Sequence, residues 1–561
     1  MGERWLRRVV IAVTLLLIAT ACGDDDDSGG TASTTTSGSV ATTPATTLAP
    51  QKGGTLNAGQ FTAILGLDPA KLAGAGSVGA IELSAIYDTL MRYNPETRKY
   101  EGRTAQSLEP NADFTVWTLK LKPGVKFTDG TDYNAAAVKF VLDRQAKEGN
   151  ANPRGQLTQF VDTVTVVDPL TLTFKLKLGW VGFPYVLSGA NGMIYSPTAF
   201  QKLNDAAKFN LTPSDAGAGP FKVKAYKPGE ALELERNATY HGGEPYLDGV
   251  KFVTISGSQA TYDAIKTGTL QAGYFVDSAV AAKAKAEKYQ TNMTLSIAGN
   301  TVNMNSGIEV TCAGGQPANL CAGKPDGEKV KAKTATSDIR VRRAVAAAVD
   351  PKVINERVYQ GTAMPNSAPF ANSPWDPKVE GPKADLTEAK RLVAEAKAGG
   401  WDGKIRVIAA NTPEGTNWAE SVRSQLASAG MEVSVDNTKD TSGVVNQVLT
   451  LRDYDVASWG YAILDDVDAA YTALLASFNS KTLRYGYGTA EFDAAVELLR
   501  TADTDPKRVE AYKKVSEIWI RDLPAHVMTA LPQGWIYSPK LHDVQRNAYT
   551  SYHLDKAWLE K

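Results

Sequence analysis

The side chains that most often carry out catalysis or bind metals are scarce in this chain. Among 561 residues there are three cysteines and four histidines, and none has the CxxC or HExxH spacing of a metal site. The sequence also lacks a G-x-S-x-G elbow, a P-loop and a dinucleotide-binding glycine motif. We therefore expect no cofactor and no enzymatic activity. A Ser-His-Asp triad is assembled in space, so a secreted hydrolase stays open as an alternative.

One segment combines aromatic and acidic side chains and could bind a ligand. Residues 454–468, YDVASWGYAILDDVD, begin as a predicted strand and continue into a predicted loop. Ligands bind in such loops at the carboxyl ends of parallel strands, where rings offer flat apolar surface and carboxylates can meet a cation. We expect four residues to contact the ligand: Trp459, Tyr461, Asp465 and Asp466. Alternatively, Trp459 belongs to the core and Asp465 or Asp468 only caps the next helix.

The elements that hold this segment alternate between strand and helix patterns. Residues 116–122 alternate between apolar and polar, which predicts a half-buried strand, and residues 161–178 and 221–236 predict two hairpins. In the first hairpin, Leu172, Phe174, Leu176 and Leu178 should share one face. Residues 405–435 read as strand, helix and strand, which predicts a parallel βαβ unit. The chain is therefore predicted to be α/β with mixed sheets.

Aspartates mark the beginnings of several predicted helices. Apolar residues after Asp338 fall on one helical face, and Asp350-Pro351 has the pattern of an N-cap followed by proline at the first helical position. Asp385 precedes Glu388 as in a capping box, and that helix should end at Gly399-Gly400.

The overall composition is that of a large globular protein. Hydrophobic residues make up 43% and charged residues 22%, and the formal net charge is −1. This balance excludes a basic nucleic-acid binder and a disordered polyelectrolyte. At roughly 100–200 residues per domain, the length suggests about three domains.

The N-terminus predicts export and a lipid anchor. Three arginines precede the apolar run 9–20, which is followed by Ala21 and Cys22, so residues 1–21 are predicted to be a signal peptide. The ending IATAC resembles a bacterial lipobox, in which the cysteine is lipidated; ordinary secretion is the alternative. Residues 22–50 contain Asp24–Asp27 and then mostly small polar residues, which predicts a disordered linker.

Export also bears on the two remaining cysteines. Cys312 and Cys321 are nine residues apart in a segment rich in Gly, Ala, Lys and Thr. In an exported protein such a pair favours a disulfide over a reactive thiol pair. We predict a disulfide without a functional role.

Several separated motifs occur in the order typical of one family. They include residues 85–97 (AIYDTLMRYNPET), 117–131 (WTLKLKPGVKFTDGT), 219–223 (GPFKV), 339–350 (IRVRRAVAAAVD) and 487–493 (YGTAEFD). From about Gly53 to the C-terminus the chain thus resembles the extracellular solute-binding proteins of ABC importers, of the dipeptide, oligopeptide and nickel type.

The resemblance implies a two-lobed, periplasmic-binding-protein-like fold with three domains and a hinge between the lobes. Residues 51–85, 213–301 and 525–561 would form the first lobe, with residues 86–212 inserted as a second domain; residues 302–524 would form the second lobe. In peptide-binding relatives an aspartate shortly after the tryptophan meets the ligand's α-amino group. Alignment on Trp459 places Ala462 there, so Asp465 or Asp466 would have to supply the carboxylate. The scarcity of histidine argues against nickel.

The partners implied by the resemblance are a peptide-like or other amphipathic solute and an ABC permease with its ATPase. We expect a monomer tethered by lipid at the extracytoplasmic face of the bacterial cell membrane, facing the periplasmic space, and no nucleic-acid partner. A lipoprotein sensor that presents ligand to a signalling partner is a second alternative.

Overall fold

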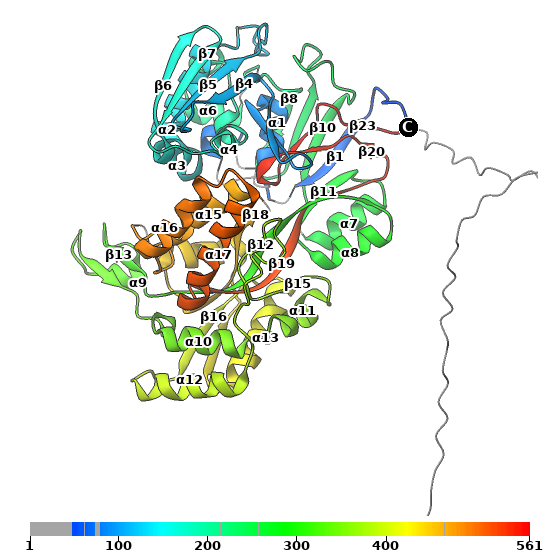
Figure 1. The fold of residues 1–561 in the computed structure, drawn as a ribbon. Coiled ribbons are helices and arrows are strands. Elements are labelled where there is room, and N and C mark those ends of the chain that lie inside the picture. Colours follow the sequence, from blue (N-terminus) through cyan, green and yellow to red (C-terminus); the bar gives the residue numbers. More distant parts are fainter. Residues whose placement is uncertain are drawn as a thin grey trace, which may run out of the picture. The chain divides into compact units, whose positions relative to one another are not determined.

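The computed structural model describes residues 48–60, 62–64, 66–72, 79–212, 215–255, 257–464, 466–481 and 483–561. Contacts divide the chain into residues 1–49 and 50–561, and the fold described below is that of the second part (Figure 1). The predictions for the signal peptide, for Cys22 and for most of the linker therefore lie outside the described residues.

An eleven-stranded mixed sheet runs through the described residues, in the order β17-β16-β18-β12-β19-β11-β1-β10-β9-β8 with β15 paired to β19. Its strands are β1 (Thr55–Gln60), β8 (Phe221–Lys227), β9 (Ala231–Arg236), β10 (Gly249–Thr254), β11 (Ala272–Phe275), β12 (Gln290–Met304), β15 (Met364–Pro365), β16 (Lys404–Ile408), β17 (Glu432–Asp436), β18 (Val456–Leu464) and β19 (Ala525–Tyr537). The hairpin predicted at residues 221–236 is confirmed as β8 and β9.

The long strands β12 and β19 join the two halves of this sheet. They pair antiparallel from Gln290 with Tyr537 to Asn303 with Ala525. The register shifts between Ser296 and Thr301, and the pairing of β12 with β18 shifts over the same residues. Such bulges bend a strand. The two halves of the sheet therefore meet at a locally irregular stretch of β12.

The first half of the sheet carries three buried or half-buried helices. They are α1 (Ala80–Tyr87), α7 (Ser258–Lys266) and α8 (Ser278–Ala286). All eight residues of α1 are buried, while α7 and α8 pack with β11 and β19 around a separate small core. Short C-terminal strands complete this half: β20 (Leu541–His542), β21 (Gln545–Arg546), β22 (Tyr552–His553) and β23 (Trp558–Leu559).

A smaller antiparallel sheet has the order β4-β5-β7-β6. Its strands are β4 (Ala105–Pro110), β5 (Val116–Leu121), β6 (Val161–Asp168) and β7 (Thr171–Leu176), preceded by the hairpin β2 (Met91–Asn94) and β3 (Lys99–Gly102). The helices of this region are α2 (Ala135–Glu148), α3 (Ala151–Phe160), α4 (Pro184–Leu187), α5 (Pro197–Leu203) and α6 (Ala206–Leu211).

The alternation in these strands places the core as predicted, with one correction. Trp117, Leu119 and Leu121 are buried, as the pattern of β5 requires. In β7, Leu172 and the two apolar residues that follow at period two are buried as well. Leu178, however, is 59% exposed, because the ladder ends at Leu176 and the chain turns away.

The other half of the large sheet is an α/β region, as the sequence predicts. Strands β16 and β17 are parallel and are connected by α13 (Pro413–Ser428). The helices α10 (Ile339–Ala348), α11 (Pro351–Tyr359) and α12 (Leu386–Ala398) begin after Asp338, Asp350 and Asp385, and each of these carboxylates accepts a hydrogen bond from a backbone N–H of its helix. The two predicted caps, Asp350 and Asp385, are thus present, and Asp338 is a third.

A second group of helices, α15 (Val467–Phe478), α16 (Ala490–Arg500) and α17 (Asp505–Asp522), follows β18. The short α14 (Thr441–Asn446) precedes that strand. Buried residues of α15–α17 belong to the same hydrophobic cluster as those of the small sheet. Figure 1 shows these helices beside the small sheet.

The two cysteines lie in an excursion formed by β13 (Glu309–Thr311), α9 (Ala318–Cys321) and β14 (Lys329–Lys331). Cys312 and Cys321 are joined as a disulfide in the structure, with their Cα atoms 5.4 Å apart. The excursion projects from the sheet (Figure 1).

Candidate ligand-binding site

Trp459 and Tyr461 both lie inside β18, which continues to Leu464 and so runs past Trp459, where the sequence predicted the strand to end. The parallel pairing of β18 with β16 covers only Val456 and Ala457. On its other edge, however, β12 pairs with β18 as far as Leu464. The second ladder therefore extends the strand past the end of β16, and only residues 465 and 466 remain between β18 and α15.

Trp459 is half-buried in the middle of this strand. Its carbonyl oxygen accepts a hydrogen bond of 3.1 Å from the hydroxyl of Thr301 on β12. Its indole meets the ring of Tyr485 edge to face, with the centroids 6.4 Å apart. The ring is thus held by neighbours while part of its surface stays accessible, which is the arrangement that an aromatic ligand contact needs.

Tyr461 is only 3% exposed. Its phenol donates a hydrogen bond of 2.6 Å to Oδ1 of Asn303, and its ring packs against Phe478, Tyr485 and Trp519. Burial raises the pKa of this phenol well above its usual range. In this structure Tyr461 therefore anchors β18 to the helices behind it and presents almost no surface to a ligand.

The two acidic residues expected to contact the ligand, Asp465 and Asp466, follow β18 directly. Asp466 is the N-cap of α15, and its Oδ1 accepts a hydrogen bond of 2.8 Å from the backbone N–H of Asp468. Its Oδ2 lies 3.4 Å from the phenol oxygen of Tyr100, whose single proton is shared between this oxygen and Oδ2 of Asp468. Asp465 lies outside the described residues. The observed contacts of Asp466 are therefore those of a cap and of a bridge to β3.

Asp468, which the sequence suggested only as a possible cap, makes the longest-range contacts of this segment. Its Oδ1 accepts a hydrogen bond of 3.2 Å from Nε1 of Trp180, and its Oδ2 accepts one of 3.3 Å from the phenol of Tyr100. Burial raises the pKa of Asp468 to about 6, although Arg508 and the two donors act in the opposite direction. These partners are 288 and 368 residues away, so no local pattern could have revealed them.

The region inserted between β1 and β8 packs firmly on the helices that follow β18. Tyr471 lies against Phe160 and Trp180, at centroid distances of 5.9 and 5.4 Å. The backbone N–H of Val181 donates a hydrogen bond of 3.4 Å to the carbonyl oxygen of Arg500, and the Arg500 guanidinium donates to the carbonyl oxygen of Gly179. A pocket of about 450 Å³ opens between Leu178 and Leu475 beside this contact.

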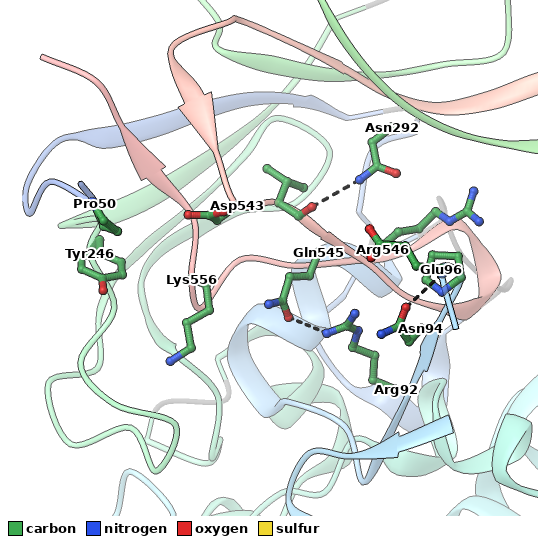
Figure 2. Close-up of a pocket in the computed structure, with 12 residues that line it drawn as sticks. Pro50, Arg92, Asn94, Glu96, Tyr246, Asn292, Asp543, Gln545, Arg546 and Lys556 are labelled. Carbon is green, nitrogen blue, oxygen red and sulfur yellow. Dashed lines mark hydrogen bonds between the residues drawn. The ribbon is translucent and has the colours of Figure 1, made fainter. Parts of the chain in front are cut away.

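A second pocket, of about 520 Å³, lies at the surface of the first half of the sheet (Figure 2). Its three cationic side chains form hydrogen bonds with neighbouring protein groups. Arg92 donates to Oε1 of Gln545 at 2.8 Å. Arg546 donates to the carbonyl oxygen of Met293 at 2.7 Å, and Lys556 donates to the carbonyl oxygen of Gly242 at 2.6 Å. Figure 2 shows the Arg546 and Lys556 side chains extending in different directions. The charged groups therefore do not converge on one ligand position.

No cluster of three or more His, Cys, Asp or Glu side chains among the described residues could hold a metal ion. No helix in the described part of the chain is both long and apolar enough to cross a membrane.

The large mixed sheet has two halves, which β12 and β19 join, and a smaller sheet accompanies it. This architecture defines a two-lobed α/β protein of the periplasmic-binding-protein type. A model of the family described as bacterial extracellular solute-binding proteins, family 5 middle region, matches residues 99–482. The chain belongs to this family.

Similar proteins agree with this assignment. The glutathione-binding protein GsiB of Pectobacterium atrosepticum is 26% identical over 294 residues, which are 52% of each chain, so the match spans about half the length of that relative. The oligopeptide-binding protein AppA of Bacillus subtilis is 25% identical over 499 residues, covering 82% of this chain and 83% of AppA. The structure of B. subtilis AppA in complex with a nonapeptide matches with a TM-score of 0.70 at 21% identity, covering 91% of this chain and 100% of that one, which shows a common fold.

Proposed function

We propose that this protein captures a peptide-like solute between its two lobes and delivers it to an ABC permease driven by a separate ATPase. The observation that carries the proposal is the partly accessible side chain of Trp459, held on β18 beside the irregular stretch of β12 in a chain of this family. The relatives GsiB and AppA are described as binding glutathione and oligopeptides, which are both peptides. Their ligands support a peptide-like solute here.

In this proposal the residues of the segment have different roles. Trp459 stacks on the ligand, and Asp465 offers a carboxylate to a cationic group in place of the aspartate that Ala462 replaces. Asp466 can contact the ligand only if it no longer caps α15, because Oδ1 of Asp466 accepts a hydrogen bond from the backbone N–H of Asp468. Tyr461 supports the site from behind through Asn303.

We also propose that the lobes move about β12 and β19. Residues 51–85, 213–301 and 525–561 then form the first lobe, with residues 86–212 inserted into it, and residues 302–524 form the second. The register shifts between Ser296 and Thr301 support a hinge there, because irregular pairing is easier to bend than a continuous ladder. Cys22 would hold the protein at the extracytoplasmic membrane face by its lipid, and residues 23–50 would act as the tether.

Native mass spectrometry of the purified protein tests the central claim, since a binding protein often retains its solute. Calorimetric titration with glutathione and with a nonapeptide follows, each compared with its N-acetylated form. We expect one peptide class to bind and acetylation to weaken it, because acetylation removes the cation that Asp465 would meet. Binding of neither peptide, together with a non-peptide solute in the mass spectrum, would refute the proposed substrate class.

Two further readouts separate the proposed role from its alternatives. Deletion of the permease genes should abolish uptake of the labelled solute, whereas a sensor would leave uptake unchanged. Release of a cleaved product during the titration would instead indicate a hydrolase.

A further inference from the structure

Asp468 is a buried carboxylate that connects parts of the molecule far apart in the sequence. It lies in the first turn of α15, in the proposed second lobe, and is 6% exposed. Both donors to its side chain, Trp180 and Tyr100, belong to the region inserted in the proposed first lobe. Each carboxylate oxygen thus has one partner from across the contact.

The packing around this carboxylate is close. Trp180 is completely buried, and a Cβ atom on Gly182 would overlap Oδ1 of Asp468. Only glycine at position 182 therefore lets the backbone of the inserted region come this near to α15. One turn further along α15, the hydroxyl of Thr472 lies 3.5 Å from the phenol oxygen of Tyr185.

The groups that face Asp468 are almost all neutral or acidic. Tyr100 comes from β3, Trp180 from the segment before α4, and Tyr185 from α4 itself. On its own side Asp466 and Tyr471 belong to the same helix, with Asp466 at its cap. Arg508 of α17 is the cation that acts on Asp468, but its guanidinium is hydrogen-bonded to Asp505 at 3.0 Å. Among the described residues, the buried carboxylate therefore has no close ion-pair partner.

We propose that Asp468 is a positioning residue, a proton-sensitive clasp that holds the inserted region of the first lobe on the second and so sets the balance between open and closed forms. The inference rests on the proposed function, because a clasp matters only if the lobes separate and close. It concerns the contact beside the ligand site and not the ligand itself.

The direction of the pH effect follows from linkage. Opening the lobes would expose Asp468 to water, where the pKa of an aspartate is about 4. Burial raises the pKa of Asp468 to about 6 in the contact seen here, so the closed form binds a proton more tightly than the open form. A falling pH therefore favours closure, and between pH 7 and pH 5 the ratio of closed to open protein should rise about tenfold.

Three variants of the full chain test the clasp. Small-angle X-ray scattering and hydrogen exchange of residues 179–187 are recorded on the empty protein from pH 7.5 to pH 5. Asp468→Asn is close in shape to the protonated acid and should be more closed than wild type at pH 7, with no pH response in this range. Tyr100→Phe removes one donor and should shift the protein toward the open form. Asp263→Asn, an exposed aspartate on α7 outside this contact, should behave as wild type.

The proposal is overturned if Asp468→Asn keeps the pH response of wild type, or if wild type has none. Circular dichroism checks that each variant is folded, and Tyr100→Phe remains as an independent test should Asp468→Asn fail to fold. Titration with the nonapeptide separates this result from the proposed function. Peptide binding with an unchanged closure equilibrium in all variants refutes the clasp alone, whereas Asp468-dependent closure without peptide binding refutes the substrate class alone.

Discussion

The phenol oxygen of Tyr461 lies 2.6 Å from Oδ1 of Asn303, and this hydrogen bond links the middle of β18 to β12 in the interior of the protein. The amide nitrogen of Asn303 in turn donates to the phenol of Tyr454, at 3.2 Å. Two tyrosines of one segment are thus fixed by a single asparagine on the neighbouring strand. Of the two aromatic residues expected to bind ligand, this arrangement leaves Trp459 as the one with accessible surface.

Tyr461→Phe should therefore affect stability and not binding. Removing the hydroxyl leaves a buried amide oxygen without this donor, which should lower the free energy of unfolding by about 1–2 kcal/mol. Urea denaturation measures the loss, with Tyr246→Phe, a half-buried phenol at the surface pocket, as the control. A large loss of peptide affinity without loss of stability would place Tyr461 in the ligand site instead.

Trp459→Ala should weaken binding of the solute at least tenfold, which corresponds to about 1.4 kcal/mol, because an aromatic anchor is lost. Trp401→Ala is the matched control, since that indole is also half-buried in the second lobe but hydrogen-bonded locally to the carbonyl oxygen of Lys404, at 3.0 Å. Both variants should lose about 1–2 kcal/mol of stability. Calorimetry should show reduced affinity only for Trp459→Ala; equal affinities would exclude Trp459 from the site.

Arg103→Met should be strongly destabilising. Its guanidinium lies 2.9 Å from Asp88 and 3.0 Å from Asp555, and all three side chains are nearly inaccessible. Removing the guanidinium takes the arginine partner away from two buried carboxylates, which should lower the free energy of unfolding by about 3–5 kcal/mol. The exposed Arg391, paired with Glu388 and Glu395, is the control, and Arg391→Met should cost less than about 1 kcal/mol.

The same cluster should make wild type sensitive to acid. Burial alone would raise the pKa of Asp88, but Arg103 and the hydrogen bond from His241 outweigh it and hold the pKa well below its usual range. The stabilisation that ionised Asp88 gives to the folded protein is therefore fully present above the pKa of an aspartate in the unfolded chain, about 4. It is lost as the pH falls below that value. Urea midpoints at pH 3 and pH 6 should differ more in wild type than in Arg103→Met. An equal acid response in the two proteins would contradict this assignment.

The double variant Cys312→Ser/Cys321→Ser should bind solute as wild type does. The disulfide closes a short local loop, so its loss should reduce stability by roughly 2–3 kcal/mol through the unfolded state. Thiol titration of the native protein should find this pair oxidised. Two reactive thiols, or a clear drop in affinity of the double variant, would argue against a purely structural bond.

Cys22→Ser should release the protein from cells into the medium, because it removes the thiol that would carry the lipid. Fractionation followed by immunoblotting measures the distribution, and Cys312→Ser/Cys321→Ser, which leaves Cys22 in place, should stay with the membrane. Firm membrane attachment of Cys22→Ser would rule out anchoring through this residue.

Much of the local structure could be predicted from the sequence because its causes are local. The alternation of Trp117, Leu119 and Leu121 determines which face of β5 is buried, and Asp350 and Asp385 cap the N–H groups of residues two or three positions ahead. The parallel strands β16 and β17 follow from a strand-helix-strand pattern within about 30 residues. The family, too, was evident from the sequence, through motifs in a fixed order.

The details of the candidate site were decided by tertiary structure. β18 runs to Leu464 because β12, more than 150 residues earlier, offers a second ladder where β16 ends. The same pairing brings Asn303 to Tyr461 and buries a residue that the sequence analysis expected to contact the ligand. The partners of Asp468 come from another part of the chain, and a carboxylate's burial and donors depend on such neighbours, not on the residues beside it in sequence.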